Sequence, residues 1–332
     1  MQPTICTGAD ILADIRHATA LANRNNITRT EAYLRFYLDH PEIEWAMLAH
    51  LVSRNGGWNM TDLKGDWLPL LLDEQERGAF FHFMERCNWL IFHDAYAQLL
   101  LYATMKQQGD DLTELLVPLG ISHFMTDIWR EFLHTRDSVR LTHGLIINEQ
   151  QYIEQRVVQK PFYRKEVLDT LPFHLQSWFS FNHLLFPYHT SPWEKEPRLC
   201  GITVHRFASL EQRIRIGKSA YHMLRANANR FRQIVGWAKG TPHTGSRADY
   251  WPGRFTPSSV QAQTSIYSPA LADAWKDTSH APADGVDWYR DRKWLDWLGD
   301  EIELLPELTD QEYSRSLQLM RAAIALLHPF SS

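Results

Sequence analysis

The sequence predicts an all-α protein, a large bundle-like array of helices with one long irregular loop from about residue 240 to 268. Most of the chain repeats its apolar residues with the helical period, and helix-capping pairs precede several of these stretches. Strand-like alternation is convincing in one place, Gly201–Phe207. With 332 residues, 44% of them hydrophobic, the chain is expected to form a single α-helical domain over 1–332, with 1–190 and 200–332 as alternative halves.

Seven helices are predicted in chain order. Four have a capping pair, in which a polar residue precedes a Glu or Gln by three positions. The helix after Pro41 is expected to end at Gly56, because glycine commonly follows the last helical turn. The predicted helices are Thr28–Leu38 (cap Thr28/Glu31), Pro41–Gly56, Asp73–Gln108 (cap Asp73/Glu76), Asp110–Asp137, Tyr163–Phe186, Ser209–Trp237 (cap Ser209/Gln212) and a last helix from Thr309 (cap Thr309/Glu312).

The stretch Thr170–Trp193 carries no Asp, Glu, Lys or Arg and therefore raises the question of a membrane span. Its histidines, prolines and amides instead favour a buried or interfacial helix. The net charge of −5 gives no general attraction to nucleic acid or an anionic membrane. The three cysteines, Cys6, Cys87 and Cys200, are too few and too far apart for a disulfide framework or a cysteine zinc site. Together with the lack of an N-terminal signal pattern, this predicts a cytoplasmic protein.

A basic stripe follows one face of the helix predicted after Ser209. Residues 205–254 carry ten basic and two acidic residues, a net charge of +8, whereas residues 271–312 carry a net charge of −8. The stripe is either an anion-binding surface or a face that is solvated or paired with acids inside the fold, and the second alternative is favoured. Its members are Arg215, Lys218, His222, Arg225 and Arg232.

No sequence motif for nucleotide binding, zinc hydrolysis or a serine nucleophile is present, so the sequence leaves the cofactor, if any, unknown. The one weak metal candidate is Asp127, Glu131 and His134, which share a face of a predicted helix. A di-iron helical bundle would need a second such set, which the sequence lacks, so a solvated polar edge is the simpler interpretation.

Two segments hold more polar and aromatic residues than turns require, 54–64 and 240–254, and we expect them to form one binding site for an anionic small molecule. Arginine binds phosphate or carboxylate with two hydrogen bonds, and glycine lets the backbone approach a ligand. The hypothesis requires Trp58 and Tyr250 to lie on the same side of the molecule. The candidate residues are His50, Arg54, Asn55, Trp58, Asn59, Asp62, Lys64, His243, Arg247, Asp249, Tyr250 and Trp251.

Two alternatives remain open. The first is an enzyme of unknown class in which His50 or His243 acts as acid or base with Asp62 or Asp249 as its partner. The second is a structural or interaction protein without a small-molecule site, in which the charged residues pair internally. A nucleic-acid partner is not favoured, a membrane partner is less so, and the sequence is compatible with a homo-oligomer.

Four segments carry a resemblance to a known family: NITRTEAYLRFYLDHPEIEWAMLAHLVSRNGGWNMTDLKGDWLP, FFHFMERCNWLIFHDAYAQLLLY, INEQQYIEQRVV and GTPHTGSRADYWP. They are similar to the YppC-like family of Bacillus-type bacteria, a domain of unknown function of type 2515. The resemblance covers most of the chain from about Thr28. It implies a bacterial, cytoplasmic protein and no particular reaction.

A shorter resemblance is to chitinase-like and lysozyme-like glycoside hydrolases, which end a helix with a catalytic acid before two glycines and carry a later Thr-Gly-Arg loop. Ser53–Trp58 and Thr244–Tyr250 are similar to these two patterns. Arg54, however, stands where the acid is expected. Without a carboxylic acid, no group there would protonate the leaving sugar oxygen, so hydrolysis is not favoured.

Overall fold

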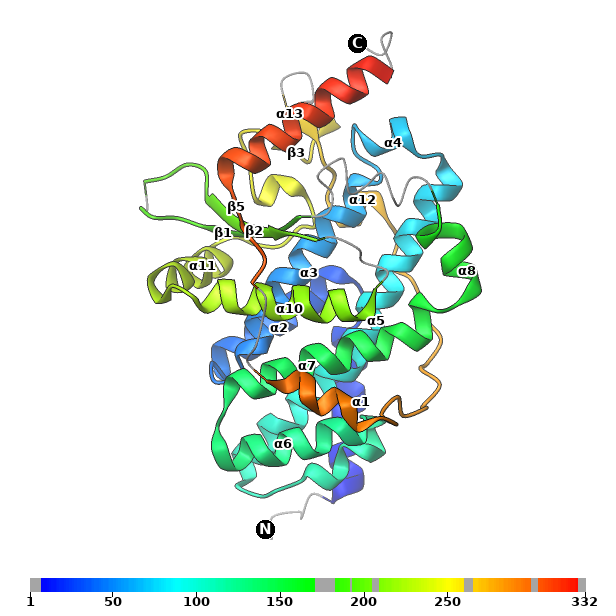
Figure 1. The fold of residues 1–332 in the computed structure, drawn as a ribbon, viewed down its shortest axis with the longest axis vertical. Coiled ribbons are helices and arrows are strands. Elements are labelled where there is room, and N and C mark those ends of the chain that lie inside the picture. Colours follow the sequence, from blue (N-terminus) through cyan, green and yellow to red (C-terminus); the bar gives the residue numbers. More distant parts are fainter. Residues whose placement is uncertain are drawn as a thin grey trace, which may run out of the picture.

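The computed structural model describes residues 7–170, 183–191, 193–204, 209–259, 265–299 and 304–327. Helices make up most of this part of the chain (Figure 1). The longer helices are α1 (Gly8–Ala22), α2 (Asn26–Asp39), α3 (Glu44–Asp62), α5 (Glu74–Gln108), α6 (His123–Thr135), α7 (Ser138–Ile153), α10 (Leu210–Arg225), α11 (Ala228–Gly240) and α13 (Asp310–Leu327). The shorter ones are α4 (Leu68–Leu71), η1 (Thr113–Leu115), η2 (Val117–Leu119), η3 (Glu154–Val158), α8 (Pro161–Tyr163), η4 (Arg164–Leu168), η5 (Arg247–Asp249), α12 (Leu271–Ala274) and η7 (Arg292–Leu298).

The all-α prediction is wrong in one respect, because the helices surround two small sheets. Strands β1 (His183–Tyr188), β2 (Arg198–Thr203) and β5 (Glu307–Thr309) form an antiparallel sheet in the order β1-β2-β5. Strands β3 (Phe255–Thr256) and β4 (Ile266–Tyr267) pair in parallel within the segment predicted as a loop. β2 overlaps the predicted strand Gly201–Phe207 at residues 201–203, and residues 205–207 lie outside the described residues. β1 was predicted as helix, because a short, continuously buried apolar run has no period that separates the two structures.

Three of the four predicted capping pairs are confirmed. Asp73 and Glu76 exchange hydrogen bonds at the start of α5, as do Thr309 and Glu312 at α13, and Ser209 accepts from the Gln212 N–H at α10. The first pair is wrong by one turn. Asn25 caps α2, and Thr28 takes the third helical position that had been assigned to Glu31.

The helix predicted from Ser209 to Trp237 is two helices. α10 ends at Arg225, and Asn227 begins α11 by accepting hydrogen bonds from the N–H groups of Asn229 and Arg230. Asparagine favours such caps because its side chain competes for backbone donors. The regular apolar spacing continued across this break, which is why it predicted one helix.

Two other predicted helices are also shorter than expected. Of the predicted helix 110–137, residues 123–135 form α6, after two short turns that end at Gly120 with a φ of 86°. Of the predicted helix 163–186, residues 183–186 belong to β1, and residues 171–182 lie outside the described residues. Among the residues that the structure describes, no helix is both long and apolar enough to cross a membrane.

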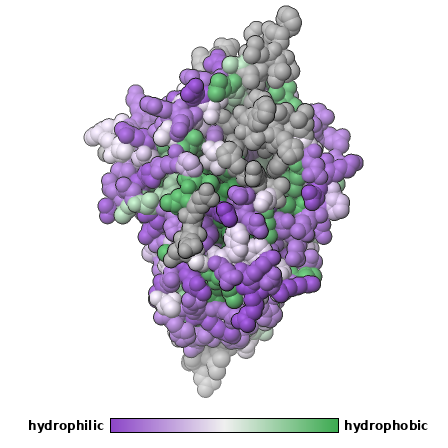
Figure 2. Space-filling view, in the orientation of Figure 1, coloured by the Kyte–Doolittle hydropathy of each residue, from purple (hydrophilic) through white to green (hydrophobic). Residues whose placement is uncertain are grey.

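Helix α3 lies near the middle of the ribbon and contacts α2, α5, α7, α10, α12 and β1 (Figure 1). It does not end at Gly56, as expected, but continues through both glycines to Asp62. The segment 54–62 is therefore helix and not loop. The visible face in Figure 2 is mostly hydrophilic, with small hydrophobic patches, and the buried apolar residues form one cluster that extends from Ile11 to Met320.

Candidate functional site

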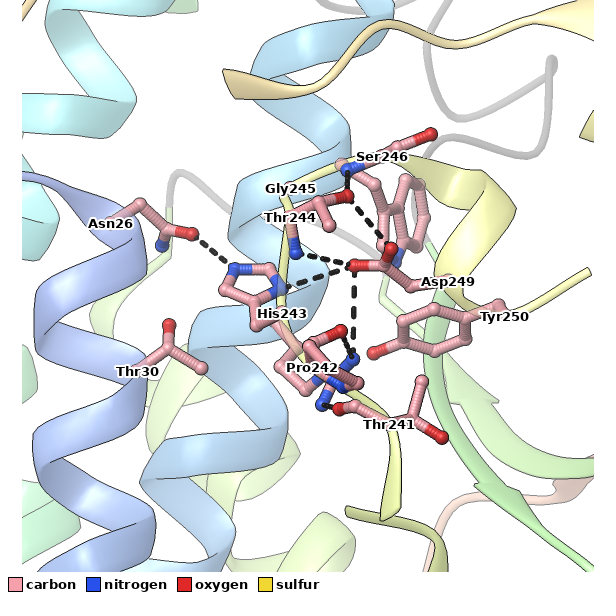
Figure 3. A network of polar contacts seen from close by, with 12 residues as sticks. Asn26, Thr30, Thr241, Pro242, His243, Thr244, Gly245, Ser246, Asp249 and Tyr250 are labelled. Carbon is pink, nitrogen blue, oxygen red and sulfur yellow. Dashed lines mark hydrogen bonds and ion pairs between the residues drawn. The ribbon is translucent and has the colours of Figure 1, made fainter. Parts of the chain in front are cut away.

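The two segments that the sequence singled out lie against each other. The rings of Trp58 on α3 and Tyr250 are 6.3 Å apart, edge to face, and each residue is only 1% exposed. The binding hypothesis required the two residues to lie on the same side of the molecule, and they do. Figure 3 shows the polar network that joins α2, α3 and the segment 241–250. The contacts of each residue decide whether this region is open to a ligand.

Arg54 is buried, and its guanidinium group contacts other protein groups. Its two terminal nitrogens donate to the carbonyls of Thr241 at 2.7 Å and Pro242 at 3.0 Å (Figure 3). The group lies over the Trp237 ring, 4.4 Å from its centroid, and 3.7 Å from a carboxylate oxygen of Asp249. Arg54 therefore anchors the chain after α11 to the centre of the molecule.

Asp62 and Arg247 form a second buried pair. The Asp62 carboxylate accepts from Arg247 Nε at 2.8 Å and from a terminal Arg247 nitrogen, and its other oxygen accepts from Ser268 Oγ at 2.8 Å. Arg247 also donates to the Tyr313 hydroxyl and lies 4.1 Å from the centroid of the Trp58 ring. The donors of this arginine are thus directed at protein groups as well.

The two candidate histidines are buried and differ in their contacts. His243 contacts Asn26 Oδ1 through Nε2 at 2.7 Å and lies 3.6 Å from Asp249 through Nδ1 (Figure 3). His50 contacts the Thr30 carbonyl through Nδ1 at 2.9 Å. Burial lowers the pKa of His243 to about 4 and that of His50 to about 3. Both are therefore neutral at pH 7.

Asp249 completes this network. Burial alone would raise its pKa, but contact with His243 and two hydrogen bonds from Thr244 hold the pKa below the ordinary value. Of the proposed acid–base pairs, the structure brings His243 close to Asp249. The 3.6 Å separation is longer than a hydrogen bond.

Three of the other four candidates also contact protein groups. Asn55 exchanges hydrogen bonds with both backbone groups of Leu185 on β1, at 2.8 and 2.9 Å. The Lys64 ammonium lies 4.7 Å from the Trp275 ring centroid, and the Trp251 ring lies 4.6 Å from that of Tyr313. Asn59 faces a different environment, described below.

Gly57 shows how closely this side of α3 is packed. A Cβ atom there would lie 2.5 Å from Asn26 Oδ1 and 2.7 Å from His243 Cε1. We call this side of α3 the packed face, made of Met47, His50, Arg54, Gly57, Trp58 and Thr61. Its packing is what the structural alternative expects of these residues.

The opposite side of α3 lines a cavity of about 710 Å³. We call this side the cavity face, made of Ala49, Val52, Gly56 and Asn59, which follow each other at spacings of 3, 4 and 3 residues and so form one stripe. Val52 is 42% exposed although α3 is surrounded by other elements, because its side chain lines this cavity.

The cavity draws its other walls from distant parts of the sequence. Apolar side chains come from α5, α7, β1 and α10, among them Phe83, Met84, Ile153, Leu184 and Ile216. Polar groups are fewer and include Asn88 on α5 and Glu149 and Gln150 on α7. Mainly apolar walls with a few polar groups are typical of small-molecule sites.

Sequence reasoning missed this cavity for a physical reason. Asn55 and Asn59 were among the candidates and do line it, but Arg54, Trp58 and Asp62 do not. Charged and aromatic residues drew attention to the packed face, whereas the cavity face is made of small residues. The available signal was Ala49, Val52 and Gly56, a line of small side chains on a helix otherwise rich in large ones.

The basic stripe does not form a continuous free surface. Lys218 is buried and donates to the carbonyls of Trp297 at 2.7 Å and Gly299 at 2.8 Å, and His222 contacts His143. Arg225 pairs with Glu44 at 2.8 Å, and Arg215 lies 5.9 Å from the Trp297 ring centroid. Arg232 is exposed on α11, beyond the break between the two helices. Internal contacts thus account for most of the stripe.

The weak metal candidate lies on α6. Glu131 pairs with Arg140 at 2.7 Å and Asp127 lies 3.9 Å from Arg130, while His134 is exposed. Over the described part of the chain, no three His, Cys, Asp or Glu side chains come close enough to hold a metal ion. The described cysteines, Cys87 and Cys200, are buried and unbonded, and burial raises the pKa of each thiol to about 12.

Comparison with known proteins gives a family but no reaction. The model of a family of proteins of unknown function, DUF2515, matches residues 21–314. The uncharacterized protein YppC of Bacillus subtilis (strain 168) is 40% identical over 312 residues, which cover 93% of each chain. No solved structure matches the chain. The match extends through α3, the cavity walls and the polar network, and the chain belongs to the DUF2515 family.

Proposed function

We propose that the protein binds a small, mainly apolar molecule in the cavity beside α3. The observation that carries this proposal is Val52, a large apolar side chain that is 42% exposed on a helix surrounded by other elements. Exposing apolar surface inside a protein forgoes about 25 cal/mol per Å² of stabilisation, so a cavity of this kind weakens the fold unless a ligand fills it. Its volume of about 710 Å³ lies in the usual range for ligand sites.

The cavity is a better candidate than the packed face for steric and electrostatic reasons. Arg54 and Arg247, the residues on which the anionic-ligand prediction depended, already donate to carbonyls, to Asp62 and to Tyr313. An anion would have to displace these contacts. Binding at the cavity requires no such rearrangement, and it keeps Asn55 and Asn59 from the original set.

A fluorescence titration with the neutral dye Nile red tests the proposal. We expect saturable binding with a blue-shifted emission, because the dye would leave water for an apolar site, and competition by 1-octanol. Val52→Phe should weaken binding about 10-fold, because the larger ring would occupy part of the cavity that the dye needs. The matched control is Val117→Phe, the same substitution at a valine that is 41% exposed outside the cavity, and it should leave binding unchanged.

Two outcomes would contradict the proposal. The first is a lack of saturable dye binding by the folded protein. The second is equal binding by Val52→Phe and wild type, which would locate the dye elsewhere. Native mass spectrometry of the protein as purified offers an independent check, since a stoichiometric extra mass would identify a tightly held ligand.

A further inference from the structure

Glu149 is a carboxyl group inside the cavity without a cationic partner. It lies on α7, lines the cavity and accepts a hydrogen bond from Gln150 Nε2 at 3.1 Å. Its side chain is enclosed by protein yet partly accessible, because the cavity itself provides the accessible surface. Over the described residues, no Lys, Arg or His lies within ion-pair distance of it.

The charged side chains nearby do not balance Glu149. Arg29 on α2 lines the same cavity but pairs with Glu85 at 2.5 Å. Arg213 on α10 also lines it and pairs with Glu154. Each arginine thus has its own carboxylate, and the Glu149 carboxyl is left without a counter-charge.

Burial therefore raises the pKa of Glu149 to about 8, and the neighbouring Asp94 contributes to the rise. At pH 7 the group is mostly protonated in the empty cavity. A ligand that brings a positive charge to this position would favour the ionised form and replace the lost solvation with a charge-assisted hydrogen bond. A ligand carboxylate would instead be repelled by the ionised form.

We propose that Glu149 is the polar anchor of the cavity and that the ligand is an organic cation, an amine with an apolar body. This inference rests on the proposed function and adds the charge of the ligand to it. The apolar walls would hold the body of the ligand, and Glu149 would receive the N–H groups of its ammonium. Asn59 and Asn88, which line the same cavity, offer further hydrogen-bonding groups.

Isothermal titration calorimetry with three probes of equal chain length tests the charge: octylammonium, 1-octanol and octanoate. At pH 8.5 we expect octylammonium to bind on the order of 10-fold tighter than 1-octanol, the usual effect of one charge-assisted hydrogen bond. Glu149→Gln should remove that difference. The matched control is Glu131→Gln, a carboxyl on α6 outside the cavity, which should behave as wild type.

The pH dependence provides a second readout. Because Glu149 must lose its proton to pair with an ammonium, the affinity for octylammonium should rise by about 10-fold in total between pH 6 and 8.5 and then level off. The other charged or titratable groups that face this position are Arg29 and Tyr33 on α2, Asp94 on α5 and Arg213 on α10. Glu149→Gln should abolish this pH dependence, which a contribution from those groups would preserve.

The outcomes separate this inference from the proposed function. If 1-octanol and octylammonium bind equally and Glu149→Gln changes neither, the cavity binds apolar molecules and the amine inference is wrong. If octanoate binds tightest, the ligand is anionic, as the sequence predicted, and the inference is overturned. If no probe binds to the folded protein, the proposed function fails together with it.

Discussion

The packed face and the cavity face of α3 lie on the same helix but differ in packing and in charge pairing. On the packed face, Arg54 is buried with its charge matched by carbonyls and Asp249. On the cavity face, small side chains leave about 710 Å³ unfilled, and across it Glu149 is buried without a counter-charge. A cluster of charged and aromatic residues can therefore be a closely packed contact between segments, whereas a cavity can be lined by small and apolar residues.

The largest effect should come from breaking an ion pair at the packed face. Asp62→Asn would leave Arg247, which is 2% exposed, as a buried charge without its carboxylate. We expect a loss of about 3–5 kcal/mol in the free energy of unfolding, measured by urea denaturation. The control is Glu31→Gln, which removes an exposed pair with Arg35 at 3.6 Å and should cost less than about 0.5 kcal/mol. A similar small cost for both variants would mean that the packed face is not rigid.

Two adjacent glycines sharpen the comparison, because they lie on different faces. Gly57→Ala would place a Cβ 2.5 Å from Asn26 Oδ1, and we expect a net loss of about 1–3 kcal/mol in stability. Gly56→Ala would place one 3.2 Å from Asn88 Nδ2, a side chain that can move into the cavity. Since alanine favours helix by about 1 kcal/mol over glycine, this variant should be neutral or slightly stabilised. Thermal unfolding of both variants measures the contrast, and the reverse order would contradict it.

A pH dependence of opposite sign is expected on the two sides. His50 and His243 have pKa values of about 3 and 4, below the unfolded value of 6.5, so their contribution to stability is lost as the pH falls below 6.5. Glu149 has a pKa of about 8, above the unfolded value of 4.5, so its contribution is lost as the pH rises from 4.5 through 8.

Replacing Glu149 should leave the pH dependence that the two histidines cause without the opposing contribution of this carboxyl group. In Glu149→Gln, the free energy of unfolding should rise with pH more steeply than in wild type, by up to about 1.4 kcal/mol per unit between pH 5 and 7. Urea denaturation at pH 5, 6 and 7 measures this slope. Parallel slopes for the variant and wild type would show that Glu149 is ionised in the folded protein throughout this range.

Local signals in the sequence predicted local structure well. The caps at Asp73, Ser209 and Thr309 depend on interactions between residues three positions apart, and each is present. The strand predicted near Gly201 is present in part, as β2. The prediction failed where distant residues compete with local preference. Gly56 is a typical helix terminus, yet α3 continues through it to Asp62, and Asn26 and His243 pack against the next residue, Gly57.

The candidate site, too, has features that the local sequence predicts and features that depend on distant residues. The sequence identified segments 54–64 and 240–254 as unusual, and the structure brings them into contact, but no pattern in either segment reveals that the donors of Arg54 would be used by carbonyls about 190 positions away. Nor does it reveal Glu149 as a cavity residue, because the cavity joins α3 to walls from α5, α7, β1 and α10.

The sequence by itself determined the helical character, the starts of α5, α10 and α13, and the family, since these depend on short-range patterns and on similarity along the chain. The tertiary structure decided which side of α3 is closely packed and which side lines a cavity. The physical reason is that burial, charge pairing and empty volume depend on what each side chain meets across the fold, and for His243 and Glu149 those neighbours come from distant segments.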